Sequence, residues 1–158
     1  MWRASLLFAC FCAAAPVAAQ VTTCSGADAA VSLGNYDAYQ STPADSSAVF
    51  VVTCTRSGGP PTALVTVGLG PSLNSGTIAA RSAKHTSAAD LLAYNFYRDA
   101  GRLLVWGNTA GIDAVSQSIS LANNTSGTIT FTLYGRINAL QDVRPGVYND
   151  TLTITVTF

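Results

Sequence analysis

The chain has 158 residues, and its eight basic and eight acidic residues cancel to a formal net charge of zero. This balance gives no electrostatic reason to expect binding to nucleic acid or to an anionic membrane. Only 10% of the residues are charged, all the acids are Asp, and Ser and Thr are abundant. Because Glu and Lys normally cover exposed helix faces, their scarcity favours a protein built of β-strands.

Residues 1–19 are predicted to be a secretory signal peptide. One basic residue, Arg3, precedes an apolar run over residues 6–15, and small residues lead up to Ala19, after which we expect cleavage. The run is too short to span a membrane. A lipid-attachment box at residues 7–10 is the alternative, but it lies too early in the run. We therefore expect one mature domain, residues 20–158.

Removal of the signal peptide leaves two cysteines, Cys24 and Cys54. An even number of cysteines in an exported chain indicates a disulfide bond, with two free buried thiols as the alternative. If both cysteines are paired, the sequence offers no Cys/His cluster at metal-ligand spacing. We expect neither a metal ion nor a cofactor.

Short alternating apolar runs, separated by Gly, Pro, Asn and Asp, predict seven or eight strands and no helix. This pattern is typical of an antiparallel β-sandwich of immunoglobulin-like size. Val31 and Leu33 lead into a turn at residues 34–37. Strands are expected at 47–54, 63–69, 91–99, 103–108, 118–121, 128–137 and, at the C-terminus, 152–158.

The connections between these strands differ in length. Residues 70–90 show no sustained period and are predicted to be a long connection, with room for a short strand through Ile78. Residues 91–99 and 103–108 flank a tight turn and are predicted to form a hairpin. Residues 108–117 are expected to form a loop.

The C-terminal sequence VYNDTLTITVTF has the period of a strand with one buried face. Thr alternates with a set of apolar residues, and this alternation predicts that Phe158 is a core residue. The apolar set is Leu152, Ile154, Val156 and Phe158. A final strand of this kind either lies between two existing neighbours or leaves one side of its ladder open.

No catalytic residue can be assigned. The single histidine, His85, lies in a polar stretch and is expected to be a solvated loop residue. Residues 70–74 fail the G-x-S-x-G pattern of serine hydrolases at the last position, and most aspartates occupy turn contexts. The protein is therefore predicted not to be an enzyme.

Two tyrosines are candidates for contact with another molecule. Tyr97 and Tyr134 fall on the face opposite the apolar sets of their strands. An aromatic ring on an outer face can bind a surface or a carbohydrate.

Several segments carry a resemblance to a known family, in order along the whole predicted mature chain: Cys24, LGNY at 33–36, VVTC at 51–54, LAYNFYRD at 92–99, VWG at 105–107, YGRI at 134–137, Gln141 and GVYNDT at 146–151. Together they resemble the spore coat protein U domain. That family includes the subunits of Csu-type, archaic chaperone-usher pili.

The resemblance implies an immunoglobulin-like sandwich that lacks its last strand, so that the C-terminal strand borders an open apolar groove. A periplasmic chaperone would fill this groove first. The N-terminal extension of another subunit would then replace the chaperone at the outer-membrane usher, by β-augmentation. The implied partners are the chaperone, the usher and other pilus or coat subunits at the cell surface. Residues 152–158 would line one wall of the groove, with Val31 and Leu33 near the other.

One feature departs from the family. A donor extension needs about ten residues of strand, but only residues 20–23 precede Cys24 after the expected cleavage. This predicts a subunit that accepts a strand without giving one, as at the tip of a fibre. A self-contained secreted binding module with a complete sandwich remains the alternative.

Overall fold

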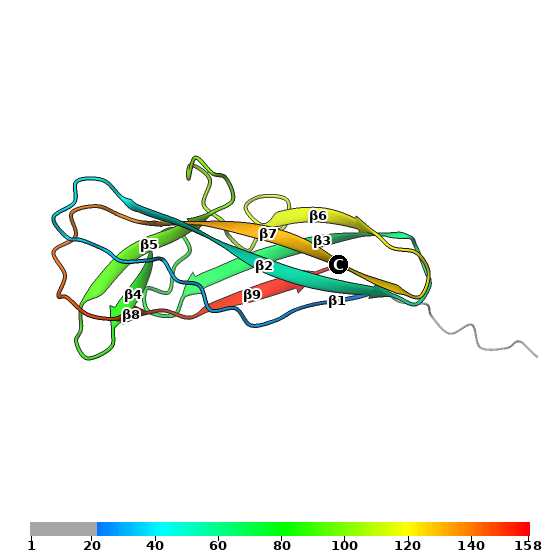
Figure 1. Ribbon diagram of the computed structural model, residues 1–158, viewed down its shortest axis with the longest axis horizontal. Coiled ribbons are helices and arrows are strands. Elements are labelled where there is room, and N and C mark those ends of the chain that lie inside the picture. The colour runs from blue at the N-terminus through cyan, green and yellow to red at the C-terminus, as the bar shows by residue number, and fades with distance from the viewer. Residues whose placement is uncertain (1–21) are drawn as a thin grey trace, which may run out of the picture.

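Nine β-strands and no helix make up residues 22–158, the part of the chain that the computed structural model describes (Figure 1). The predicted signal peptide and its alternative lipid box lie outside these residues. The strands are β1 (Thr22–Gly26), β2 (Ala44–Arg56), β3 (Thr62–Ser72), β4 (Arg81–His85), β5 (Leu91–Tyr97), β6 (Val115–Ser120), β7 (Thr125–Ile137), β8 (Tyr148–Asn149) and β9 (Leu152–Thr157).

The strands form two antiparallel sheets packed face to face. One sheet has six strands in the order β1-β2-β7-β5-β4-β8, and the other has three in the order β6-β3-β9. The long strands β2 and β7 pair along residues 44–56 and 125–137. The predicted antiparallel, immunoglobulin-like sandwich is confirmed.

The core lies between the sheets and follows the predicted alternation. Phe131 on β7 is completely buried, as are Val65 and Val67 on β3. Trp106 reaches the core from a loop and is 1% exposed. Its indole N–H donates to the Val67 carbonyl oxygen at 2.9 Å, which meets the requirement that a buried polar group be paired.

Hydroxyl side chains cover much of the outer faces of both sheets. The outward residues of β9 are all threonines, and outward threonines also occur at residues 128, 130 and 132 of β7 and at 53 and 55 of β2. Some hydroxyls bond to each other across strands: Thr55 to Ser126 at 2.7 Å, and Thr66 to Ser116 at 2.8 Å. These hydroxyl-bearing parts of the outer surface are polar and uncharged, whereas β2 also exposes Val49 and Val51 and its Asp45 forms an ion pair with Arg136 of β7.

Residues 70–90 do contain a short strand, but not at the position through Ile78 that the prediction allowed. Strand β4 lies within these residues and pairs with β5, whereas Ile78 lies in a turn. The strand escaped notice because its first residue is Arg81, which breaks the apolar pattern. Arg81 is nevertheless completely buried, since backbone carbonyls from other segments accept its hydrogen bonds.

The predicted hairpin is only partly correct. Residues 103–108 are not a strand, and a single bridge joins Tyr97 to Val105. The chain then leaves β5, because the Gly107 carbonyl accepts the Leu69 N–H of the other sheet at 2.9 Å. Strand β6 begins at Val115, inside the predicted loop.

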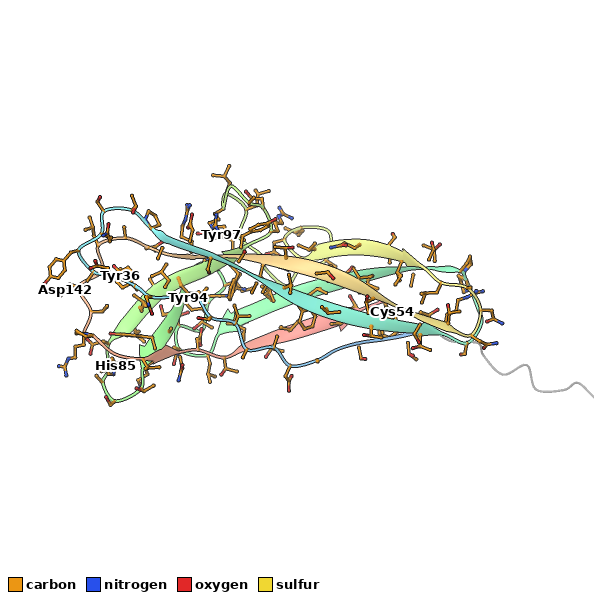
Figure 2. All side chains as sticks on the ribbon, viewed as in Figure 1. Tyr36, Cys54, His85, Tyr94, Tyr97 and Asp142 are labelled. Atoms are coloured by element: carbon orange, nitrogen blue, oxygen red, sulfur yellow. A yellow bond between two sulfur atoms is a disulfide. The ribbon has the colours of Figure 1, made fainter. Side chains whose placement is uncertain are left out.

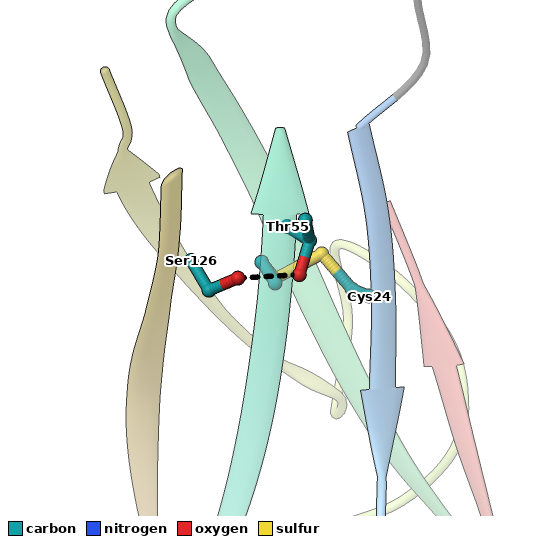
Figure 3. The surroundings of a disulfide bond; sticks show 4 residues. Cys24, Thr55 and Ser126 are labelled. Carbon is teal, nitrogen blue, oxygen red and sulfur yellow. Dashed lines mark hydrogen bonds between the residues drawn. A yellow bond between two sulfur atoms is a disulfide. The ribbon is translucent and has the colours of Figure 1, made fainter. Parts of the chain in front are cut away.

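The predicted disulfide between Cys24 and Cys54 is present. The two cysteines are direct partners in the β1–β2 ladder (Figure 3), so the bond fixes the short edge strand β1 to its long neighbour. It closes a sequence separation of 30 residues. A loop of that size stabilises the fold by about 3.5 kcal/mol in the chain-entropy description.

Candidate functional site

One edge of β9 has no strand partner among the described residues. Strand β9 is an end strand of the three-stranded sheet and pairs with β3 alone. Beyond its other edge lie β1 and the coil that follows β1, which Figure 1 shows as a blue trace running alongside β9. No ladder joins β9 to either of them, so the sandwich is open along this line.

A groove of about 1220 Å³ follows this opening. The coil at residues 29–39 forms the first wall, and Leu152 and Ile154 of β9 belong to the second. Residues 140–150 surround the far end. Its floor consists of buried core side chains from both sheets: Leu69, Ala83, Leu92, Tyr94, Phe96, Leu133 and Ile137.

The inward side chains of β9 are less buried than those of its neighbour. On β3, the three inward apolar side chains at residues 65–69 are at most 1% exposed. On β9, Leu152, Ile154 and Val156 pack against the core but are only half-buried. Both strands alternate in the same way, so the difference follows from the missing neighbour on the outer side of β9.

The backbone of β9 also directs hydrogen-bonding groups toward the groove. Leu69 of β3 is paired with Ile154, but its N–H donates to the Gly107 carbonyl, away from β9. In an antiparallel ladder such a pair exchanges no hydrogen bonds, and the bonded pairs alternate with it. The N–H and C=O groups of Ile154 and Val156 therefore face the open edge, whereas those of Thr155 face β3.

A polar network lies beneath the groove. The Tyr94 hydroxyl donates to Asp150 Oδ2 at 2.8 Å, and Asn74 Nδ2 donates to Asp150 Oδ1 at 2.9 Å. Burial, and secondly the bond to Asp150, raise the pKa of Tyr94. The Tyr94 hydroxyl therefore stays protonated and donates its hydrogen bond across the ordinary pH range.

The predicted groove residues are brought together only in part. Val31, Leu33, Leu152 and Ile154 line the same groove. Val31 and Leu33 belong to a coil and not to a strand. Phe158 is 56% exposed, and the prediction that it is a core residue is wrong, because β9 ends at Thr157 and no element covers the residue after it.

The candidate surface tyrosines lie outside the groove. Tyr97 and Tyr134 are direct partners in the β5–β7 ladder and both are half-buried. Arg102 lies over the Tyr134 ring at 5.9 Å. Close by, Asp45 accepts two hydrogen bonds from Arg136, at 2.7 and 2.9 Å. Mainly because of this pairing, the pKa of Asp45 lies below its ordinary value.

His85 is not the solvated loop residue that was predicted. It is the last residue of β4 (Figure 2). It is half-buried, and its ring meets the Tyr148 ring in a T-shaped arrangement with 5.0 Å between centroids. Its Nδ1 accepts the Ser87 N–H at 3.1 Å, and its Nε2 lies 3.2 Å from the Pro145 carbonyl oxygen. His85 thus joins the β4 turn to the loop at the far end of the groove.

Apart from the groove, metal sites and membrane-spanning helices among the described residues would bear on the function. Within residues 22–158, His, Cys, Asp and Glu side chains nowhere gather in threes that could hold a metal ion. No helix in that range has the length and apolar character needed to cross a membrane.

For two residues at the far end of the groove, the sequence pattern predicted no role. Tyr36 and Gln141 bond to each other across 105 positions of sequence. Both belong to segments that carry the family resemblance, and this was the only signal that could have found them.

A curated relative and a solved structure are similar to this chain. Protein U of Myxococcus xanthus is 34% identical over 100 residues, which are 61% of this chain and 52% of that protein. The chain thus spans about half the length of this relative. A chain of the chaperone–tip adhesion subunit pre-assembly complex CsuC–CsuE, from the archaic chaperone-usher Csu pili of Acinetobacter baumannii, matches with a TM-score of 0.55. It shares 20% identity, over 87% of this chain and 40% of that chain.

The structural likeness supports the fold. The family model named Spore Coat Protein U domain matches residues 7–155, which is nearly the whole sequence. The chain with this groove, disulfide and open strand edge therefore belongs to the Spore Coat Protein U domain family.

Proposed function

We propose that this protein is a secreted structural or adhesive subunit that accepts a β-strand from a partner. The observation that carries the proposal is the open edge of β9, which lies beside an apolar groove and half-buried inward side chains. An unpaired edge of this kind lacks both ladder bonds and burial until another strand is added. The added strand would complete the sandwich.

The geometry of β9 defines what a donor strand must provide. An antiparallel donor residue opposite Ile154 or Val156 would exchange hydrogen bonds with it and would also point its side chain inward. A donor therefore needs apolar residues at every second position. Val31, Leu33, Leu152, Ile154 and Val156 would contact these side chains, which is the pattern of β-augmentation.

The partners follow from the family relationship. A periplasmic chaperone would occupy the groove first, an outer-membrane usher would exchange it, and another pilus or coat subunit would supply the final strand. The protein would reach the cell surface through the periplasm and would act without catalysis. A position at the tip depends on cleavage after Ala19, and sequencing the N-terminus of the mature protein tests it.

The experiment compares thermal unfolding with and without a synthetic peptide that alternates Val with Thr or Lys. At a peptide concentration of one hundred times its Kd, binding adds about 2.7 kcal/mol, which raises the Tm by about 10 °C. A peptide of the same composition in scrambled order is the control. Replacement of Ile154 by Asn should abolish the shift, whereas replacement of the outward Thr155 by Asn should preserve it.

A sharp, reversible transition that neither peptide alters would contradict the acceptor role. It would favour the self-contained binding module, for which the paired Tyr97 and Tyr134 beside Arg102 are the specific feature. Loss of ligand binding in a Tyr97→Ala variant would then be the next measurement.

A further inference from the structure

The first wall of the groove is held in place without strand pairing. Between β1 and β2, residues 27–43 form no strand, although Val31 and Leu33 lie half-buried against the core. A donor strand can fit only if this coil keeps its distance from β9. Something other than a ladder must therefore fix the coil.

Tyr36 supplies one attachment. The Gln141 N–H donates to the Tyr36 hydroxyl oxygen at 2.6 Å, and this oxygen also lies 3.5 Å from the Gln141 carbonyl. Tyr36 is half-buried, and Figure 2 shows it at the far end of the groove beside the loop that contains Asp142. The coil is thus bonded to the segment that follows β7.

Gln141 is itself bonded to the six-stranded sheet. Its side-chain Oε1 accepts the Ala93 N–H at 2.7 Å, and its Nε2 donates to the Ala93 carbonyl at 2.9 Å. The β5–β7 ladder ends at the pair Tyr94 and Ile137. The amide of Gln141 therefore adds two bonds at the end of this ladder, where the Asn138 N–H also donates to the Ala93 carbonyl at 3.4 Å.

Leu33 supplies the second attachment. A Cβ atom at Gly135 of β7 would lie 2.5 Å from Leu33 Cδ2, so the Leu33 side chain rests on β7 at a position that only glycine leaves open. Between the two attachments lies Gly34, whose φ of 86° is one that other residues rarely adopt. The turn at Gly34 allows Leu33 and Tyr36 both to face the sandwich.

We propose that Leu33 on Gly135, together with the bonds among Tyr36, Gln141 and Ala93, forms a clasp that holds the first wall ready for a donor strand. Tyr36 and Gln141 are then positioning residues for strand binding. The inference rests on the proposed acceptor function. It also gives a role to parts of the LGNY and YGRI segments and to Gln141, which carried the family resemblance.

The test measures the affinity of the full mature chain for a fluorescein-labelled peptide that alternates Val with Thr or Lys. Tyr36→Phe keeps the ring but removes the bonded hydroxyl. It should weaken binding about tenfold, the factor that corresponds to a net hydrogen bond. Thr55→Val is the matched control, because it also removes a bonded hydroxyl, which lies 2.7 Å from Ser126 Oγ, but at a position outside the groove lining, and its affinity should equal that of the unaltered protein.

A second pair of variants tests the bond to the sheet. Gln141→Ala should weaken binding at least as much as Tyr36→Phe, and Gln40→Ala, at an exposed position of the coil, should not. Hydrogen exchange of residues 27–36 without peptide should become faster in both clasp variants. Hydrogen exchange reports on the first wall itself and can be measured without a donor strand.

A general loss of stability must be separated from loss of the clasp. Ile129→Val removes a methyl group from a core position outside the groove lining, so it should lower the Tm while peptide affinity stays unchanged. If Tyr36→Phe binds the peptide as tightly as Thr55→Val and residues 27–36 exchange at the same rate in both, the clasp is refuted and the acceptor function stands. If the unaltered protein binds no peptide, both proposals fall.

Discussion

Arg81 is a fully buried cation whose described hydrogen-bond partners are all neutral. Its guanidinium donates to the carbonyls of Leu69, Gly70 and Trp106 and to Asn95 Oδ1, at 2.7 to 3.1 Å. Burial lowers its pKa, but a guanidinium remains charged at any ordinary pH. Arg81 therefore connects β3, β4, β5 and the Trp106 loop through one side chain.

Replacement of Arg81 by Met should destabilise the protein by about 3 kcal/mol, because the neutral oxygens lose their donors inside the core. Urea unfolding measures this loss. Arg144→Met is the control, since the Arg144 side chain is 71% exposed in its ion pair with Asp90 and surface pairs contribute little. Equal stability of the two variants would show that the buried network is dispensable.

At the scale of elements, β9 has two different edges. The edge toward β3 uses the backbone of Thr155, and the edge toward the groove presents that of Val156. The Val156 side chain packs inward and that of Thr155 is exposed, and their N–H groups point to opposite edges of the strand. A substitution that removes an N–H therefore distinguishes the edges.

Proline should act oppositely at these two positions, since it has no N–H and is tolerated mainly at open strand edges. Thr155→Pro breaks a ladder bond to β3 and should cost about 3 kcal/mol in urea unfolding. Val156→Pro should lower the free energy of unfolding by much less, but it should weaken binding of the alternating peptide. If Val156→Pro binds the peptide normally, the donor does not pair with this edge.

At the scale of the whole molecule, the three-stranded sheet has two end strands of different character. Strand β6 presents exposed Ser116, Gln117 and Ser118, whereas β9 borders the apolar groove. Both edges could template another chain. Half-buried apolar side chains occur on both strands, Val115 and Ile119 on β6 among them, but the apolar groove adjoins β9.

The protein without a donor should consequently self-associate through β9. An inward-pointing charge blocks such pairing, so Val156→Lys should reduce association, and Ser118→Lys on β6 should not. Static light scattering across a concentration series measures the effect. Equal suppression by both variants would mean that association is governed by net charge instead of by the groove edge.

The sequence predicted those features that depend on local periodicity. Burial alternates along β3 and β7 as expected, because each strand has a complete set of neighbours there. The same rule failed for Phe158, since periodicity does not reveal where the neighbouring element ends. Strand β4 was missed because the burial of Arg81 depends on acceptors far away in sequence. Likewise, the bond between Tyr36 and Gln141 spans 105 positions, which no local pattern can reveal.

The hydroxyl-covered outer faces have a further consequence for the environment in which the protein can persist. Threonine and serine do not ionise in ordinary conditions, so these faces keep the same polarity from acidic to alkaline media. Along β9, where the outward residues 153, 155 and 157 are all threonines, there are also no charges whose attraction or repulsion added salt would weaken, unlike at the Asp45–Arg136 pair of β2 and β7. Outside the cell, where acidity and salinity are not regulated, such a surface would stay equally well hydrated as its surroundings change.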